Sequence, residues 1–292
     1  MTTDRLKPDP TAIGGIAAAP LARLPDPVAL FGARAGRFRF LAGQVPNLGL
    51  YLAFLGDLAA AQADLAAAMG PAPRGGSAPL ALAEGLDETI GLFCARLAPI
   101  AMPAPAAAAL AALAEAGPGR RVPLALAMRE DAPDPPAADL GPMILAAAAL
   151  QVHAARRAAT LDAQALVRGE RALCPACGGR PGVSIVTATL GPEGARYCAC
   201  ATCQTLWNEL RVKCLCCGGT GGVAYRSVET DQAAIKAETC RDCGAWVKIL
   251  YQTRNPSLEP VADDVASLGL DLMMAETEWR RAGVNPFLAG YR

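Results

Sequence analysis

The chain contains very little histidine, few aromatic residues and no excess of either charge. One of its 292 residues is histidine, 5% are Phe, Trp or Tyr, and 27 basic residues balance 27 acidic ones. A net charge of zero provides no bulk attraction to nucleic acid or to an anionic membrane surface. His153 falls in an apolar helical stretch, where a packed histidine is the commoner case, and no second histidine can join it in a site.

Long hydrophobic runs are also missing. Residues 97–114 are interrupted by three prolines, and residues 140–155 form a short run that includes Gln151 and His153. A membrane-spanning helix needs about 20 apolar residues. The first 24 residues hold only a weak apolar patch between prolines, unlike the continuous core of a signal peptide. We therefore predict a cytoplasmic protein that does not insert into a membrane.

Sequence motifs of catalysis are absent as well. The chain has no phosphate-cradling glycine loop and no nucleophile elbow. Asp263 and Asp264 could be read as a carboxylate pair, but neighbouring helix positions diverge by about 100°. We interpret them as a solvated helix start and predict that the protein is not an enzyme.

Alanine-rich helix is abundant in the first part of the chain. Asp26 and Pro27 form a helix start, and the helix that follows carries Arg34 and Arg37 on one side. Apolar spacing and loop signals predict further helices at 47–69, 79–97, 105–116 and 143–158. We predict a flexible leader at 1–25, a helical domain at 26–168, and a C-terminal helix and tail at 256–292, with the helix ending at Gly283.

Ten of the eleven cysteines lie between residues 174 and 243, and eight of them form a repeat. The segment "CPACGGR" at 174–180 returns as "CLCCGGT" at 214–220. Each half reads CxxC, 22 residues, CxxC, so one supersecondary unit is used twice. The eight predicted metal ligands are Cys174, Cys177, Cys200, Cys203, Cys214, Cys217, Cys240 and Cys243.

The spacing of these cysteines has a chemical reason. A Cys-x-x-Cys turn directs two sulfurs to one side, and the glycine after it permits the positive φ that lets N–H groups approach sulfur. Two such turns supply four thiolates to one metal ion and leave no open coordination position. We predict sequentially paired four-cysteine ribbons at 169–212 and 213–255. Cross-braced pairing, disulfides and free structural cysteines are the alternatives.

Three cysteines fall outside the pattern. Cys198 and Cys216 are interpreted as small apolar residues, with oxidisable thiols as the alternative. Cys94 lies in a predicted helix and is expected in the core. The fold class is therefore α+β: an all-helical N-terminal domain, two tandem rubredoxin-like or zinc-ribbon modules, and a C-terminal helix.

The ligands do not select the metal, because zinc and iron both accept tetrahedral sulfur. Zinc ribbons often contact nucleic acid, so the charge of this region matters. Residues 171–255 hold ten Lys and Arg against six Asp and Glu, and eight thiolates with two divalent ions cancel that excess. Phosphate binding needs uncompensated positive charge, so we predict no nucleic-acid partner.

In these motifs the chain resembles the FdhE family of formate dehydrogenase accessory proteins. The resemblance rests on the four CxxC turns and on "RYCACATCQTLWNELRVKC", "AIKAETCRDCGAWVKILYQ", "VADDVASLGLDLMMAE" and "GVNPFL". It extends to "LPDPVALFGARAGRFRFLA" in the helical part, and so covers nearly the whole chain.

The resemblance implies a cytoplasmic protein needed to mature respiratory formate dehydrogenases, which binds their catalytic subunit and does not turn over formate. It also implies rubredoxin-like iron in the two four-cysteine sites formed by these eight cysteines. Zinc is the alternative. Arg34, Arg37 and the region of Trp279 are candidates for the partner surface. The competing functions are a nucleic-acid- or transcription-associated zinc ribbon and a thiol oxidoreductase that uses Cys198 and Cys216.

Overall fold

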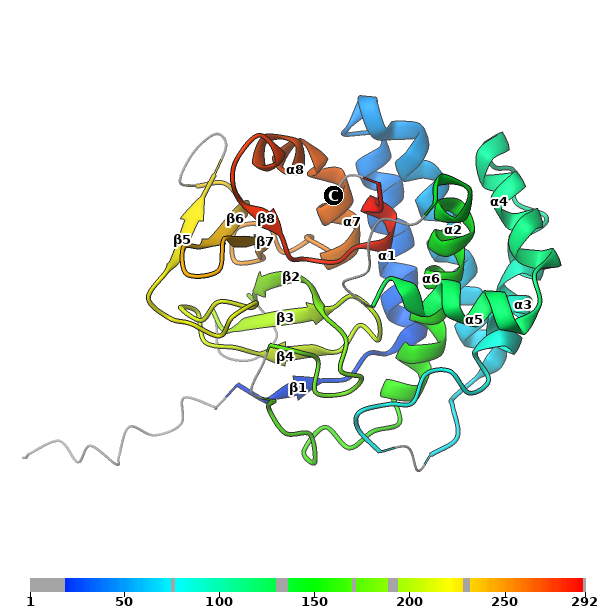
Figure 1. The fold of residues 1–292 in the computed structure, drawn as a ribbon, viewed down its shortest axis with the longest axis horizontal. Coiled ribbons are helices and arrows are strands. Elements are labelled where there is room, and N and C mark those ends of the chain that lie inside the picture. The colour runs from blue at the N-terminus through cyan, green and yellow to red at the C-terminus, as the bar shows by residue number, and fades with distance from the viewer. Residues whose placement is uncertain are drawn as a thin grey trace, which may run out of the picture.

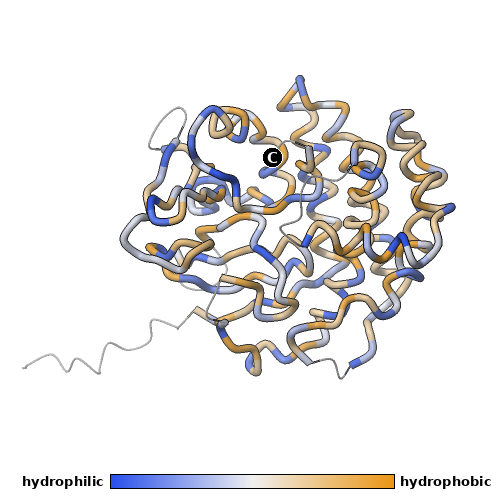
Figure 2. The backbone as a smooth tube through the Cα atoms, viewed as in Figure 1, coloured by the Kyte–Doolittle hydropathy of each residue, from blue (hydrophilic) through white to orange (hydrophobic). Residues whose placement is uncertain are grey.

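A computed structural model describes residues 19–74, 77–129, 136–169, 172–188, 194–227 and 232–290. Helices form one half of the molecule and a mixed sheet forms the other (Figure 1). Figure 2 shows hydrophobic residues along the helices and strands and a hydrophilic stretch between α8 and β8. The α+β class predicted from the sequence is confirmed.

The helical half consists of α1 (Pro27–Ala42), the 3-10 turn η1 (Pro46–Leu48), α2 (Gly49–Met69), α3 (Leu86–Leu97), α4 (Ala104–Glu115), α5 (Pro118–Ala127) and α6 (Ala137–Ala158). Asp26 caps α1 as predicted, because its carboxylate accepts from the N–H groups of Val28 and Ala29. Many large side chains of this half, among them Phe31, Leu55 and Phe93, are fully buried in one core.

Two of the predicted helix boundaries in the helical half are wrong. The helix expected at 79–97 begins only at Leu86, because the backbone N–H of Leu80 bonds instead to Ala176 O in the first cysteine turn, at 2.9 Å. The helix expected at 143–158 begins at Ala137 and includes Pro142 near its start. Helix α5 is not predicted from the sequence, since its glycine and two prolines are more typical of a loop.

Two helical segments, Pro46–Met69 and Ala137–Ala158, are long and apolar enough to cross a bilayer. They lie in the core of the helical half, with 50% and 67% of their most apolar windows buried. Core helices that are apolar on most faces share this composition with membrane spans.

The sheet half contains β1 (Ala22–Arg23), β2 (Pro181–Val186), β3 (Arg196–Cys200), β4 (Leu206–Asn208), β5 (Val223–Arg226), β6 (Ile235–Cys240), β7 (Ala245–Tyr251) and β8 (Arg280–Arg281). The strand order is β1-β4-β3-β2-β7-β6-β5, and β8 pairs with β7. The two cysteine repeats therefore share one sheet, joined by parallel pairing of β2 with β7. Residues 22–23 belong to this sheet, whereas the sequence predicts them in the leader; residues 1–18 of that leader lie outside the described residues.

The predicted C-terminal helix is two helices, α7 (Pro260–Ala266) and α8 (Leu268–Ala275), so the expected end at Gly283 is wrong. The break lies at Ser267, where the buried ammonium of Lys248 donates to the carbonyl oxygens of Asp264 and Ser267. The chain then forms β8 and the 3-10 turn η2 (Pro286–Leu288).

Two acidic residues of α7 are buried, which corrects their interpretation as a solvated helix start. Asp263 accepts two hydrogen bonds from the guanidinium of Arg37, at 2.8 and 2.7 Å. Asp264 forms ion pairs with Arg281 and Lys248. Burial without such partners would be costly for carboxylates. These residues hold the C-terminal helices against α1 and the sheet.

Arg34 is also buried, with 1% of its surface exposed. It donates to Glu259 at the start of α7 and to Gln204 beside a cysteine turn, at 3.0 and 2.7 Å. Gln204 has φ +63, a left-handed conformation that is rare outside glycine. Arg34 thus joins the helical half, the first cysteine module and α7, and neither Arg34 nor Arg37 is a free surface for a partner.

Candidate metal centres

The first cysteine cluster joins the turn before β2 to the turn after β3. Cys174 Sγ lies 3.5 Å from Cys203 Sγ, and Cys177 Sγ lies 3.5 Å from Cys200 Sγ. All four sulfurs are within 4.8 Å of one another. A tetrahedral ion with metal–sulfur distances of about 2.3 Å sets its sulfurs about 3.8 Å apart, so the cluster has the size that such an ion needs.

The second cluster repeats this arrangement around β5 and β6. Cys214 Sγ lies 3.7 Å from Cys243 Sγ, and Cys217 Sγ lies 3.8 Å from Cys240 Sγ. These four sulfurs also lie within 4.8 Å of one another. The pairs are therefore grouped sequentially, and cross-braced pairing does not occur among these eight cysteines. None of the eleven cysteines forms a disulfide, which removes that alternative.

Glycines shape both cysteine turns. Gly178 and Gly218 have φ values of +71 and +77, which turn the chain so that the next N–H donates to the second sulfur of each turn, at 3.4 Å. A Cβ on Gly179 would lie 3.2 Å from Cys177 Sγ and 3.3 Å from Cys200 Sγ. Gly179 thus leaves room for the sulfurs of the first cluster, whereas a Cβ on Gly219 would come closest to Asp242 Oδ2, at 3.0 Å.

The electrostatics of the first cluster call for a cation. Burial raises the pKa of Cys174, Cys200 and Cys203 well above the ordinary value. Hydrogen bonds from the neighbouring cysteines hold the pKa of Cys177 well below it. Four thiolates in so dry a site need a positive ion to balance them, and a divalent metal supplies that charge.

The two clusters differ in exposure. The four ligands of the first cluster are at most 2% exposed, and the backbone of its first turn bonds to the helical half, where Arg129 donates to Cys177 O at 2.6 Å. In the second cluster Cys217 is exposed and Cys243 is half-buried. The first cluster is thus buried at the interface between the two halves, whereas the second lies at the surface.

The remaining cysteines are explained by packing. Cys198 is fully buried in the middle of β3, opposite Trp207 of β4, and burial raises its pKa well above the ordinary value. Cys94 is buried in α3, as expected. Cys216 is half-buried within the second cysteine turn, and its N–H donates to Cys214 Sγ at 3.3 Å. Cys198 therefore fits the role of a small apolar residue.

The comparisons with known proteins agree along the whole chain. Family models described as "FdhE, N-terminal", "FdhE, central domain" and "FdhE, C-terminal domain" match residues 19–170, 173–211 and 212–288. A protein FdhE homolog from Rhizobium meliloti is 42% identical over all of both chains. One from Cronobacter sakazakii is 38% identical over 89% of this chain and 88% of its own.

A solved structure is similar as well. The crystal structure of the FdhE protein from Pseudomonas aeruginosa has a TM-score of 0.79 and 30% identity, covering 92% of this chain and 99% of that one. At this coverage the similarity extends over both the helical half and the sheet half. This chain belongs to the FdhE family.

Proposed function

We propose that this protein is a cytoplasmic accessory protein for the maturation of formate dehydrogenase, and that it binds the catalytic subunit of that enzyme without turning over formate. The observation that carries the proposal is family membership along the whole chain. Two closed four-sulfur clusters support a binding protein, because such sites leave no position for substrate.

The eight cysteines would hold two metal ions. Iron is favoured by the family resemblance and zinc is the alternative; bound iron would supply a one-electron redox step. Either ion would stabilise the sheet half, because a structural site contributes about 10 kcal/mol or more of folding free energy. The eight ligands and their N–H donors would fix the coordination.

We place the partner surface beside the second cluster. Leu210 and Val212, in the loop that leads to Cys214, are 59% and 58% exposed. Contiguous exposed apolar surface marks interaction sites, and these two side chains would contribute to such a surface. A subunit docked here would also cover the exposed Cys217.

Two other functions fit the structure less well. A thiol oxidoreductase would need Cys198 to be accessible, but its side chain is fully buried. A nucleic-acid-binding ribbon would need unpaired cations near the clusters. Arg196 and Lys213, two basic residues that precede the second cluster, form ion pairs with Glu238 and Glu209.

Pull-down with the cognate catalytic subunit tests the proposal. We expect enrichment over an unrelated molybdoenzyme, and we expect the double substitution Leu210→Ser with Val212→Ser to weaken it at least tenfold. Leu50→Ser is the matched control, because Leu50 is 90% exposed on α2 in the helical half. Equal recovery of both enzymes would refute the accessory role. An unchanged double variant would refute only the assigned surface.

A further inference from the structure

A threonine beside the sulfurs distinguishes the first cysteine cluster from the second. Thr205 follows the second turn of the first cluster, and its Oγ1 lies 3.2 Å from Cys203 Sγ. Forty residues later the repeat has Ala245 at the same position, and a methyl group cannot donate a hydrogen bond. Groups that hydrogen-bond to metal ligands tune the bound metal, so this difference bears on the chemistry of the first cluster.

The turn that carries Thr205 is fixed on both sides. Thr205 is 0% exposed, and its carbonyl oxygen accepts from the N–H of Cys200 at 3.0 Å. The residue before it, Gln204, has φ +63 and is hydrogen-bonded to Arg34 at 2.7 Å. Gly244 has φ +65 at the equivalent position of the second repeat. The two turns therefore share this backbone conformation, and the hydroxyl is present in only one of them.

The charge on sulfur determines the direction of the hydrogen bond. A cysteine that binds a metal does so as a thiolate, which has lone pairs and no hydrogen. The hydroxyl of Thr205 has no second partner in the part of the chain that the structure describes, and a buried hydroxyl without a partner is costly. In the metal-bound protein Thr205 therefore donates its hydrogen to Cys203 Sγ.

Backbone donors, in contrast, serve both clusters. The N–H of Gly179 donates to Cys177 Sγ and the N–H of Gly219 donates to Cys217 Sγ, both at 3.4 Å. Among the described residues, no side-chain hydroxyl lies within hydrogen-bond distance of a sulfur of the second cluster. The O–H donor is thus additional to the backbone donors that the repeat provides in each turn.

We propose that Thr205 raises the reduction potential of an iron ion in the first cluster. Four thiolates outweigh the charge of iron in either oxidation state, and the site carries one more negative charge with Fe(II) than with Fe(III). A hydrogen bond to a thiolate stabilises the more negative form, so it favours Fe(II). One electron from an outside reductant converts Fe(III) to Fe(II), and no bond is made or broken.

Thr205 acts through the sulfur of Cys203 and is a positioning residue, not a metal ligand. The inference rests on the proposed occupancy of the clusters by iron and does not depend on the partner subunit. It makes the two clusters chemically unequal, although the repeat gives both of them the same four ligands.

Potentiometric titration of the iron-loaded, full-length protein tests this inference. Absorption of the thiolate-to-iron charge-transfer bands follows the reduction of each cluster as a one-electron wave. In Thr205→Val a methyl group of similar size replaces the hydroxyl. We expect the equilibrium of one wave to shift about tenfold towards Fe(III), which lowers its potential by about 59 mV. The other wave should stay where it is.

Three further variants assign and control this effect. Cys217→Ser changes a ligand of the second cluster, so the wave that responds to Thr205 should remain in it. Thr205→Ser keeps the hydroxyl and should keep the wild-type potential. Thr205→Ala also lacks the hydroxyl and takes the place of Thr205→Val if valine prevents metal loading. Metal content and circular dichroism check that each variant is loaded and folded.

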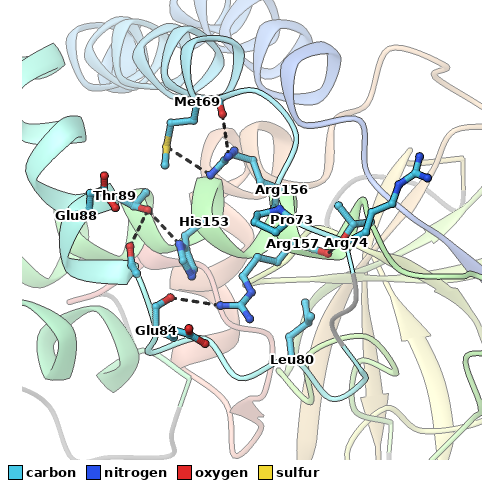
Figure 3. Close-up of a pocket in the computed structure, with 13 residues that line it drawn as sticks. Met69, Pro73, Arg74, Leu80, Glu84, Glu88, Thr89, His153, Arg156 and Arg157 are labelled. Carbon is cyan, nitrogen blue, oxygen red and sulfur yellow. Dashed lines mark hydrogen bonds between the residues drawn. The ribbon is translucent and has the colours of Figure 1, made fainter.

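Thr89→Val is the matched control for the loss of a buried threonine hydroxyl. Thr89 is also 0% exposed, but it belongs to α3, and its Oγ1 lies 3.0 Å from His153 Nδ1 and contacts no sulfur (Figure 3). This substitution removes a polar contact from the helical half without touching either cluster. Both waves should keep their wild-type potentials.

The outcomes are decisive in either direction. A lowered potential for the first cluster in Thr205→Val, restored in Thr205→Ser, confirms the inference. Unchanged waves without the hydroxyl, equal shifts with valine and serine, or a shift of both waves would overturn it. A wild type that binds no iron would overturn the proposed iron occupancy together with this inference. Binding of the dehydrogenase subunit is not measured here, so the accessory role can fail or hold independently.

Discussion

Arg196 Nη2 lies 2.6 Å from both carboxylate oxygens of Glu238, and the two side chains are 0% and 3% exposed. Arg196 belongs to the middle strand of the first cysteine module and Glu238 to that of the second. The pair therefore spans the seam between β2 and β7. Along the 40-residue repeat, Glu238 stands where the first module has Cys198, so the second module departs from the repeat at the position that receives Arg196.

Replacing Arg196 should destabilise the sheet strongly. In Arg196→Leu the carboxylate of Glu238 loses its partner, and the carbonyl oxygens of Leu210 and Lys213 lose a donor. We expect the free energy of unfolding to fall by about 3–5 kcal/mol, measured by denaturant titration. Arg39→Gln breaks an exposed pair with Asp57 and should cost less than about 1 kcal/mol. Similar losses in the two variants would contradict a structural role for the seam pair.

His153 should make stability depend on pH. The unfolded imidazole takes up a proton near pH 6.5, whereas the folded ring, with its pKa lowered to about 4, does so only in more acid solution. The unfolded state binds more protons between these values, so this contribution is present above pH 6.5 and is lost as the pH falls towards 4.

The size of that loss can be measured against His153→Gln. We expect the wild type to lose about 2–3 kcal/mol more than the variant between pH 7 and pH 4. Carboxylates contribute equally to both proteins and cancel in the difference. Parallel stability curves would show that His153 titrates normally in the folded protein.

Metal ions held by the two clusters should leave at different rates. A chelator reaches the second cluster directly, because Cys217 is exposed, whereas the four ligands of the first are buried. We expect a fast and a slow phase of equal amplitude when metal release is followed by absorbance. In Cys217→Ser the fast phase should disappear and the slow one remain. A single phase in the wild type, or loss of the slow phase in the variant, would contradict the difference in accessibility.

Gln204 should stabilise the folded protein through its hydrogen bond with Arg34, while its positive φ strains the backbone. In Gln204→Ala the buried guanidinium loses its acceptor at 2.7 Å, and we expect a loss of about 1.5–3 kcal/mol. Gln204→Gly loses the same acceptor but relieves the positive φ, so it should be about 1 kcal/mol more stable than the alanine variant. Thermal denaturation of the wild type and the two variants measures the effect of the lost hydrogen bond and the effect of the relieved strain. Equal stability of Gln204→Ala and the wild type would show that the hydrogen bond between Arg34 and Gln204 does not stabilise the junction.

The sequence alone determined the class of fold and the two cysteine sets. Metal-ligand spacing is a local property: each CxxC-Gly-Gly turn directs its own sulfurs, and the 40-residue repeat indicates which turns resemble one another. The cap at Asp26 is equally local, and the structure confirms it. Chemistry that depends on a few consecutive residues can thus be inferred before any tertiary structure is known.

Only the tertiary structure decided how these parts join. Asp263 and Asp264 look like a solvated helix start in sequence, because their partners Arg37 and Arg281 are distant along the chain. Lys248 divides the C-terminal helix through contacts that no local pattern encodes. The unequal exposure of the two clusters arises because one packs against the helical half, and a repeat that treats both turns alike does not contain that information.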